Sequence, residues 1–377
     1  MSKVGTTAAC GPTSCNSAPT LVTSRTAPPS RMGRRPVVLA LLALLVTWSL
    51  LQLLCQLGGS LLRRNTSQPV YPDGTRHRRA HSQVLLWTQI RSGSSFTGRV
   101  LSLGTRTFYS EEPIRVHNHA LGRDVGAAAA FLKDILLCRF SRHLEYFKDY
   151  ITWHFQDLKV KYLCEFEPRL CSSPFTYEAF CRAAPVVVVR VVALALRAFI
   201  PLLEDDELDP KVVHLVRDPR GALSSRRSLP SYAHLYEEES NVSAVCERYR
   251  EDLAAAATLR QRFPERYILV RYEDLALNPE REVRRLYEFA GLPFTPFVSQ
   301  FLFDHTSGLQ TREVKDAPFS LARNSTEVAD RWRDRMSYED ALAIQEQCED
   351  VLQGYGYEVF RSRREYSRRG GAAGAPS

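Results

Sequence analysis

Residues 85–98 read LLWTQIRSGSSFTG, an apolar run that leads directly into a loop of small residues with hydrogen-bonding groups. The run Val84–Ile90 is typical of a strand, and a helix is expected to follow the loop. The N–H groups at the start of such a helix lack partners within it and carry partial positive charge. The order strand, loop, helix therefore predicts an anion-binding site at the end of the strand.

Two glycines of this loop have the spacing found in the G-x-x-x-x-G-K-[ST] loop of nucleotide hydrolases. Gly93 and Gly98 fit, but Arg99 and Val100 stand where Lys and Ser/Thr are required. The Lys that reaches the β- and γ-phosphates and the hydroxyl that holds Mg²⁺ are therefore missing. The loop can hold a 5′-phosphate, but a P-loop kinase is disfavoured. For the loop taken alone, a plain Gly/Ser turn without a ligand is the alternative interpretation.

A second strand-to-turn stretch, VVHLVRDPRG, occupies residues 212–221. Arg217 at its strand end can contact a phosphate with two N–H groups, and Ser225, eight residues later, can donate from the next helix. Alone, this turn is equally typical of a solvent-exposed loop. Together with the first loop, it predicts two anion sites on one edge of a sheet.

Apolar runs alternate with helical patterns along the rest of the chain, which predicts a parallel sheet flanked by helices in one α/β domain. Strands are expected at residues 186–192, 211–216 and 267–270, and helices at 125–140, 245–263, 279–290 and 338–352. For the helix that begins at Pro279, Asn278 is the expected N-cap, and Gly291 lies just past its end.

The apolar run VVLALLALLVTWSLLQLLCQL, residues 37–57, carries no charge. At ~1.5 Å per residue it forms a helix of about 30 Å, enough to cross a bilayer. Arginines precede it and no acidic residue occurs before Asp73, so residues 1–36 are expected to be a cytosolic tail. An uncleaved signal anchor is favoured over a signal peptide, the competing interpretation, because the run is long and begins far from the N-terminus.

The chain beyond this anchor is expected to be exported. All three N-x-[ST] sequons, at Asn65, Asn241 and Asn324, follow the anchor. Six of the nine cysteines also follow it, an even number that suggests disulfides in an oxidising compartment. Residues 58–80 are interpreted as a polar stem, 81–360 as the α/β domain and 361–377 as a disordered tail. The net charge of +8 favours an anionic partner such as nucleic acid, phospholipid, a nucleotide or an acidic glycan.

The two loops resemble the 5′- and 3′-phosphate loops of sulfotransferases that use 3′-phosphoadenylyl sulfate (PAPS). More narrowly, the chain resembles the Golgi carbohydrate 6-O-sulfotransferases that act on galactose, N-acetylglucosamine or N-acetylgalactosamine. The resemblance covers about residues 82–360 and is carried by RSGSSF at 91–96, HLVRDPR at 214–220, RYEDL at 271–275, YEFAGLP at 287–293 and Trp332-Arg333.

The resemblance implies a role for each matching residue. The 5′-phosphosulfate would be surrounded by Arg91, Ser92, Gly93, Ser94, Ser95, Phe96 and Thr97. Arg217 and Ser225 would hold the 3′-phosphate that distinguishes PAPS from ATP, and Arg333 would be a further cation near the nucleotide. No metal is expected, because PAPS is already activated and no cluster of carboxylate and histidine ligands is apparent.

Sulfuryl transfer also requires a base for the attacking hydroxyl. Glu112 in FYSEEP, residues 108–113, is the expected base, because the relatives carry Glu-Pro after an aromatic pair. The alternatives are Glu111, no single base, or one of three histidines, His117, His119 and His214, of which His214 is more typical of a strand residue.

The chain departs from this family in two places. Relatives carry Lys and Arg in the strand 188–192, at positions that fall here on Val189 and Val192. Arg190 keeps one charge, although alternation along the strand could direct it to the opposite face. Residues 114–117, IRVH, replace a stretch containing Trp-His. Both changes put the acceptor in question and leave the donor site intact.

The sequence thus predicts a type II, single-pass Golgi membrane enzyme whose luminal domain transfers a sulfuryl group from PAPS. The expected acceptor is the 6-hydroxyl of GlcNAc, Gal or GalNAc in a keratan- or chondroitin-type glycan on a glycoprotein or proteoglycan. Alternatives are a tyrosylprotein or heparan sulfotransferase and a non-catalytic glycan-binding relative. Nucleic acid is not an expected partner, and homo-oligomerisation is left open. The hypothetical disulfides are Cys171–Cys181, Cys246–Cys348 and Cys138–Cys164.

Overall fold

A computed structural model describes residues 81–104, 107–116, 124–144, 165–171, 173–192, 194–228, 240–309 and 324–367. All of them belong to one compact unit, Arg78–Ser377. The expected cytosolic tail, anchor and stem, with Asn65, lie outside the described residues. None of the helices within the described ranges is long and apolar enough to cross a membrane.

Parallel strands form the centre of the fold, and the expected α/β class is confirmed. The strands are β1 (Ser82–Thr88), β2 (Thr107–Glu111), β3 (Val186–Val192), β4 (Pro210–Val216) and β5 (Tyr267–Arg271). They pair in the order β2-β3-β1-β4-β5, and every neighbouring pair is parallel. The sequence prediction lacks β2, because TFYSE is short and ends in a carboxylate instead of a β-branched run.

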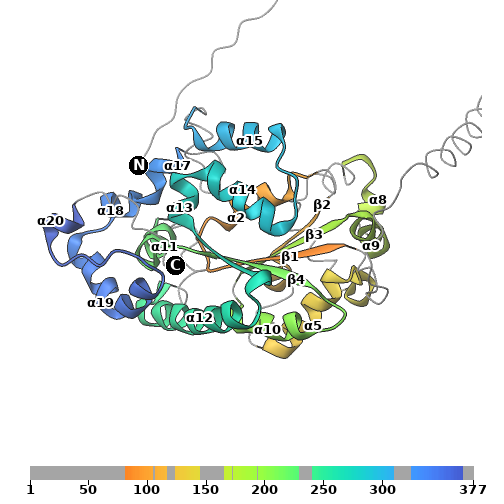
Figure 1. The fold of residues 1–377 in the computed structure, drawn as a ribbon, viewed down its shortest axis with the longest axis horizontal. Coiled ribbons are helices and arrows are strands. Elements are labelled where there is room, and N and C mark those ends of the chain that lie inside the picture. The colour runs from red at the N-terminus through yellow and green to blue at the C-terminus, as the bar shows by residue number, and fades with distance from the viewer. Residues whose placement is uncertain are drawn as a thin grey trace, which may run out of the picture. The chain divides into compact units, whose positions relative to one another are not determined.

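Helices cover both faces of this sheet, as Figure 1 shows. One face carries α2 (Ser94–Ser102), α13 (Tyr272–Leu277), α14 (Pro279–Ala290) and α15 (Pro296–Thr306). The other face carries α5 (Val125–Leu136), α10 (Ile200–Glu204) and α12 (Val242–Arg262). The remaining helices are α3 (Pro113–Val116), α8 (Pro168–Cys171), α9 (Pro174–Ala183), α11 (Pro219–Arg227), α17 (Ser325–Ala329), α18 (Arg331–Arg335), α19 (Tyr338–Gly354) and α20 (Arg363–Tyr366).

The predicted helices agree with the structure to within a few residues at most ends. Helix α14 has the expected bounds and ends at Gly291, whose φ of 70° is left-handed. Asn278 precedes the helix, but its side chain makes no capping hydrogen bond. The helix expected at residues 125–140 stops at Leu136, because Cys138 has a φ of 55° and a separate short turn, Phe140–Arg142, follows.

Side chains alternate between the two faces of the sheet and fill two hydrophobic cores. In β1, Leu85 and Trp87 pack with α5 and α12, whereas Val84 and Leu86 pack with α2 and α14. In β3, Val187, Val189 and Val191 lie on the α5 face and Val186 and Val188 on the α2 face. By this alternation Arg190, two residues after Val188, belongs to the face that α2 covers.

Two disulfides join segments that are distant in the sequence. The predicted bond Cys246–Cys348, between α12 and α19, is confirmed, with a Cα–Cα distance of 5.1 Å. Cys138 bonds to Cys181 of α9 across 5.6 Å between Cα atoms, so the predicted pairs Cys138–Cys164 and Cys171–Cys181 are wrong. The reason is tertiary: the turn after α5 packs against α9 and brings these two cysteines within bonding distance.

The C-terminal segment is folded further than predicted. Residues 363–366, within the predicted disordered tail, form α20, whose Tyr366 is buried against Trp332 and Phe360. The Tyr366 hydroxyl donates to the Met336 carbonyl at 2.8 Å. An aromatic side chain in a charged segment therefore anchors residues up to at least Tyr366.

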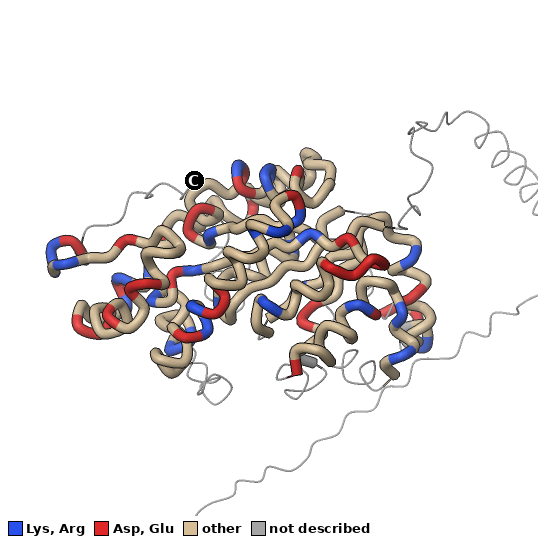
Figure 2. Tube along the Cα trace, turned by 60° about the horizontal axis from the view of Figure 1, so that its bottom comes forward, with Lys and Arg blue, Asp and Glu red and all other residues tan. Residues whose placement is uncertain are grey.

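Charged residues of both signs are interspersed along the described helices (Figure 2). Many form pairs between elements, such as Arg250 of α12 with Asp350 of α19 at 2.6 Å and Lys133 of α5 with Asp205 at 2.6 Å. The basic excess of the sequence therefore does not by itself identify a partner, and the site must be found from geometry.

Candidate functional site

The loop between β1 and α2 is wound tightly around Gly93. Gly93 caps α2 with a φ of 89°, and Arg91 also has a left-handed φ, 65°. The backbone N–H and the hydroxyl of Thr97 both donate to the Gly93 carbonyl, at 3.1 and 3.2 Å. The N–H groups of the first turn, Ser94 to Phe96, have no acceptor within the helix. They are the donors that an anion at this strand end would meet.

The seven predicted loop residues have different surroundings. Ser92 is fully buried beneath the loop, and the Thr97 hydroxyl is used within the helix. Phe96 is half-buried, with its ring 6.4 Å from that of Phe301 in α15, so it contributes packing. Ser94 and Ser95 lie at the first turn of α2, and both hydroxyls face the guanidinium of Arg190.

The two predicted anion loops contact each other directly. Arg217 donates from Nη1 to the Arg91 carbonyl at 2.8 Å, and Arg91 donates from Nε to the Ser225 hydroxyl at 3.2 Å. This contact follows from the sheet, in which β1 and β4 are neighbours and Thr88 lies opposite Leu215. The expected position of both loops on one sheet edge is therefore confirmed, and Arg91, Arg217 and Ser225 form one cluster.

Tyr272 supports this cluster from the end of β5. The Arg217 guanidinium lies over the Tyr272 ring, 4.4 Å from its centroid. The same ring packs against Gly93, where a Cβ atom would lie 2.6 Å from Tyr272 Cδ2. The sequence patterns assign Tyr272 no role, although it lies in the RYEDL stretch that follows a predicted strand. Its position directly after β5 is the signal that could have identified it.

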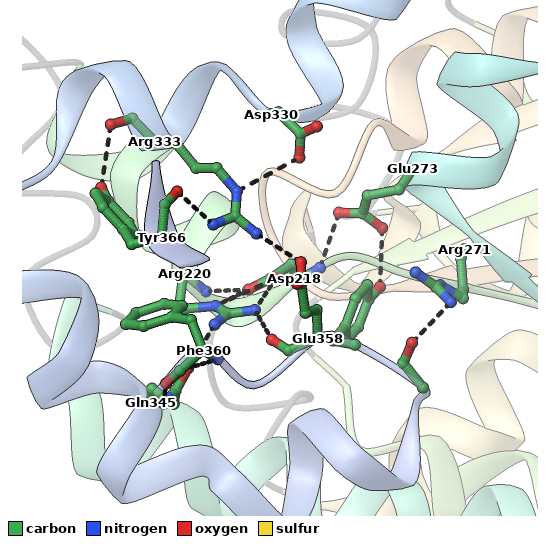
Figure 3. Close-up of polar contacts among 12 residues, drawn as sticks. Asp218, Arg220, Arg271, Glu273, Asp330, Arg333, Gln345, Glu358, Phe360 and Tyr366 are labelled. Atoms are coloured by element: carbon green, nitrogen blue, oxygen red, sulfur yellow. Dashed lines mark hydrogen bonds and ion pairs between the residues drawn. The ribbon is translucent and has the colours of Figure 1, made fainter. Parts of the chain in front are cut away.

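The charged turn after β4 contains a buried ion pair between Asp218 and Arg220 (Figure 3). Arg220 is buried, pairs with Asp218 at 2.7 Å and donates to Gln345 Oε1 at 2.9 Å. Its guanidinium lies 4.8 Å from the centroid of the Trp332 ring. Asp218 and Arg220 therefore fix the turn that presents Arg217, and do not themselves face the loop of α2.

A buried carboxyl closes this turn on the other side (Figure 3). Glu273 accepts from the Asp218 N–H at 3.1 Å and from the Tyr357 hydroxyl at 3.0 Å. Burial, with the neighbouring Asp218 charge second, raises the pKa of Glu273 to about 7. The carboxyl is a fixed part of the framework that holds the end of β4.

Arg333, predicted as a further cation near the nucleotide, contacts the C-terminal segment instead. It donates to the Tyr366 carbonyl at 2.9 Å and to Glu358 at 3.2 Å, and its ring contacts are with Trp332 and Tyr366 (Figure 3). None of the contacts described for Arg333 reaches Arg91, Arg217 or Ser225. Its proposed role in binding the donor stays a prediction.

Acidic residues at the end of β2 meet a single arginine. Arg190 of β3 donates from Nη2 to both Glu111 and Glu112, the latter at 2.6 Å, and from Nη1 to the Ser95 hydroxyl at 2.8 Å. Glu112 also donates its N–H to the Arg190 carbonyl at 2.9 Å. The structure therefore directs Arg190 toward the loop and not to the opposite face. Val189 and Val192 are buried in the sheet.

The two carboxyls differ in exposure. Glu111 is 1% exposed, whereas the Glu112 side chain is 12% exposed. Burial raises the pKa of Glu111 to about 7, against the opposing effect of the Arg190 charge. Glu112 lies just past the end of β2 with a left-handed φ of 44°, and its side chain is the more exposed of the two carboxyls.

Of the three histidines considered as alternative bases, the structure describes His214 alone. His214 is fully buried, its Nδ1 lies 2.8 Å from the Tyr267 hydroxyl, and burial lowers its pKa to about 3. It is a core residue without access to a substrate. His117 and His119 lie outside the described residues. Of the sequons, exposed Asn241 caps α12 and Asn324 precedes α17, and their glycosylation stays a prediction.

Groups of His, Cys, Asp and Glu that could hold a metal ion do not occur among the described residues.

Comparison with known proteins identifies the class of this fold and site. The family model described as "Sulfotransferase domain" matches residues 81–356, and the chain belongs to the sulfotransferases. It is 31% identical over 341 residues to carbohydrate sulfotransferase 3 of Mus musculus, covering 76% of this chain and 70% of that protein. It is 30% identical to carbohydrate sulfotransferase 6 of Homo sapiens, covering 76% and 83%. The predicted resemblance to carbohydrate sulfotransferases is thereby confirmed.

Among solved structures, the sulfotransferase domain of the Synechococcus PCC 7002 olefin synthase aligns with a TM-score of 0.45 and 16% identity. That alignment covers 78% of this chain and 100% of that domain.

Gly93→Ala tests the packing of the loop against Tyr272. A left-handed φ costs a non-glycine residue about 1–2 kcal/mol, which lowers the Tm by roughly 2–8 °C in a domain of this size. The Cβ atom would also displace the Tyr272 ring, and with it Arg217. We expect affinity for adenosine 3′,5′-bisphosphate (PAP), the nucleotide product of PAPS, to fall at least tenfold in calorimetric titration.

Gly291→Ala is the matched control, because Gly291 has a similar φ of 70° but a Cβ atom added there would meet no other atom within 4 Å. It should lower the Tm comparably and leave PAP affinity unchanged. Equal PAP affinities for the two variants would show that the contact with Tyr272 does not shape the site.

Proposed function

We propose that this chain transfers a sulfuryl group from PAPS to the 6-hydroxyl of GlcNAc, Gal or GalNAc in a keratan- or chondroitin-type glycan. We further propose that residues 37–57 anchor it in the Golgi membrane, with residues 81–360 in the lumen as the catalytic domain. The single observation that carries the proposal is the contact of the two anion loops through Arg91, Arg217 and Ser225.

The residues present suit a nucleotide with phosphates at both ends. The first turn of α2 offers N–H groups to one anion, and Arg217 and Ser225 offer donors to a second, beside the first. Arg99 and Val100 at the end of the loop motif lack the groups for ATP hydrolysis. PAPS supplies an activated sulfuryl group, which passes to the acceptor oxygen as the sulfur–oxygen bond to the 5′-phosphate breaks.

We assign the general base to Glu112. Its backbone is fixed to β3 by the hydrogen bond to the Arg190 carbonyl, and its side chain is the more exposed of the two carboxyls. A left-handed non-glycine φ is strained and is often retained where function requires it. The Glu112 carboxylate accepts the proton of the acceptor hydroxyl as that oxygen bonds to sulfur.

The acceptor class rests on the named relatives, which are carbohydrate sulfotransferases. Transfer of ³⁵S from labelled PAPS to desulfated keratan, chondroitin and heparan chains and to a tyrosine peptide tests it directly. The proposal expects label on keratan or chondroitin chains, at the 6-position after disaccharide analysis. Label only on heparan or the peptide would overturn the acceptor assignment, and PAP binding without any transfer would favour a glycan-binding relative.

Arg217→Ala should weaken donor binding without changing the chemical step. Loss of a hydrogen bond to a charged group costs about 1.5–3 kcal/mol, or roughly tenfold to a hundredfold in affinity. The KM for PAPS and the Kd for PAP should rise together. The affinity for adenosine 5′-phosphosulfate, which lacks the 3′-phosphate, should differ less between variant and wild type. An equal loss of affinity for both nucleotides would contradict the assignment of Arg217 to the 3′-phosphate.

Glu112→Gln should lower kcat roughly 10²–10⁴-fold, the usual contribution of general-base catalysis, and preserve PAP affinity within about threefold. Steady-state kcat and calorimetric Kd measure the two effects separately. Glu111→Gln is the companion variant, since this carboxyl shares the same arginine. Full transfer by Glu112→Gln, with none by Glu111→Gln, would reassign the base to Glu111.

A further inference from the structure

We propose that Arg190 is a positioning residue that joins the donor loop to the general base and so sets the rate of transfer. This inference rests on the proposed function, because it assigns Arg190 a role toward Glu112. Val189 and Val192, where the resemblance leads one to expect Lys and Arg, are apolar, and Arg190 is the basic residue of β3.

The sheet fixes where the Arg190 side chain begins. In the register of β3, Arg190 lies opposite Glu111 of β2 on one side and Leu86 of β1 on the other. The loop that follows β1 begins a few residues beyond Leu86, so a side chain on this face reaches the start of α2. Val189, one residue earlier, lies in the core on the α5 face and cannot reach it.

The guanidinium uses its two ends for two different partners. Nη1 donates to the Ser95 hydroxyl at 2.8 Å and to Ser94 at 3.4 Å, both in the first turn of α2. Nη2 donates to Glu112 at 2.6 Å and to Glu111. A planar guanidinium holds its N–H groups in a fixed fork, so the positions of Ser95 and Glu112 are tied to one another.

The charged groups around Arg190 distinguish the two carboxyls that it contacts. Arg190 is 3% exposed and faces Glu111, Glu112 and Tyr109 from the β2 side, while Arg99 of α2 acts on Glu111. Two carboxylates share one buried cation, and burial raises the pKa of Glu111 to about 7. At a pKa of about 7 Glu111 is partly protonated near neutral pH, and Glu112 is the more exposed of the two carboxyls that Arg190 contacts.

A purely structural ion pair is the competing explanation. A buried pair broken on one side is strongly destabilising, whereas replacing both partners by neutral groups is close to neutral for stability. A structural pair would therefore recover both stability and activity when both partners are neutralised. A positioning residue would recover stability alone, since the link from Ser95 to Glu112 stays broken.

Three variants of the full chain separate these outcomes: Arg190→Lys, Arg190→Met and Arg190→Met with Glu111→Gln. For Arg190→Met we expect kcat to fall about 10²-fold, as for a misplaced catalytic group, with PAP affinity within about threefold of wild type.

Arg190→Lys retains the charge but cannot bridge Ser95 and Glu112 at once, so kcat should fall about tenfold, less than for Arg190→Met. The double variant should regain the Tm that Arg190→Met loses, measured on the nucleotide-free protein, and keep its low kcat. Recovery of kcat together with Tm would overturn the inference.

Arg220→Met is the matched control, because Arg220 is an equally buried arginine paired with an acidic residue, Asp218. It should lower the Tm and raise the KM for PAPS through the turn that carries Arg217, in contrast to the unchanged donor affinity expected for Arg190→Met. If wild type labels no glycan, the proposed function fails and this inference with it. If wild type is active and Arg190→Met retains its kcat, only the inference fails.

Discussion

The hydrogen bond from the Arg217 guanidinium to the Arg91 carbonyl ties together the ends of two neighbouring parallel strands. Loops on separate strands would otherwise be free to move relative to one another. Here the Arg91 carbonyl of the first loop accepts from Arg217 of the second loop. In the opposite direction, the Arg91 side chain donates to the Ser225 hydroxyl of α11. Tyr272 closes the arrangement from the third strand end, because its ring contacts both Gly93 and Arg217. Three adjacent strands thus hold the two predicted anion loops in a fixed relative position.

Much of this can be predicted from local patterns. The strands β1, β3, β4 and β5 follow from apolar runs bounded by turn residues, and the two loops follow from small or charged residues directly after a strand. The bond Cys246–Cys348 is also among the predicted pairs. The strands and loops can be predicted from hydrophobic periodicity and from turn residues such as Gly and Pro, which are visible in a single sequence.

The rest depends on contacts between distant segments. The four letters RDPR do not show that Arg217 faces the site while Arg220 is buried against Trp332, a residue more than a hundred positions away. The partner of Cys138 is set by the packing of α9, not by spacing. In the sequence Arg190 is an isolated charge in a valine strand, and its role becomes visible only when β2, whose own pattern is weak, places Glu111 opposite it. Tertiary context decides each of these.

The contact between the loops also changes how selectivity for a ligand arises. When two sites are rigidly joined, binding at one raises the effective concentration of the other end of the same ligand at the second site. Under the proposed function, a nucleotide with phosphates at both its 5′ and 3′ ends would gain from both sites at once, whereas an abundant nucleotide such as ATP would occupy only one. The discrimination then exceeds what either loop could provide alone. Under the proposed function, the bond between Arg217 and Arg91 would add to the selectivity that the 3′-phosphate contact provides against the cell's common adenine nucleotides.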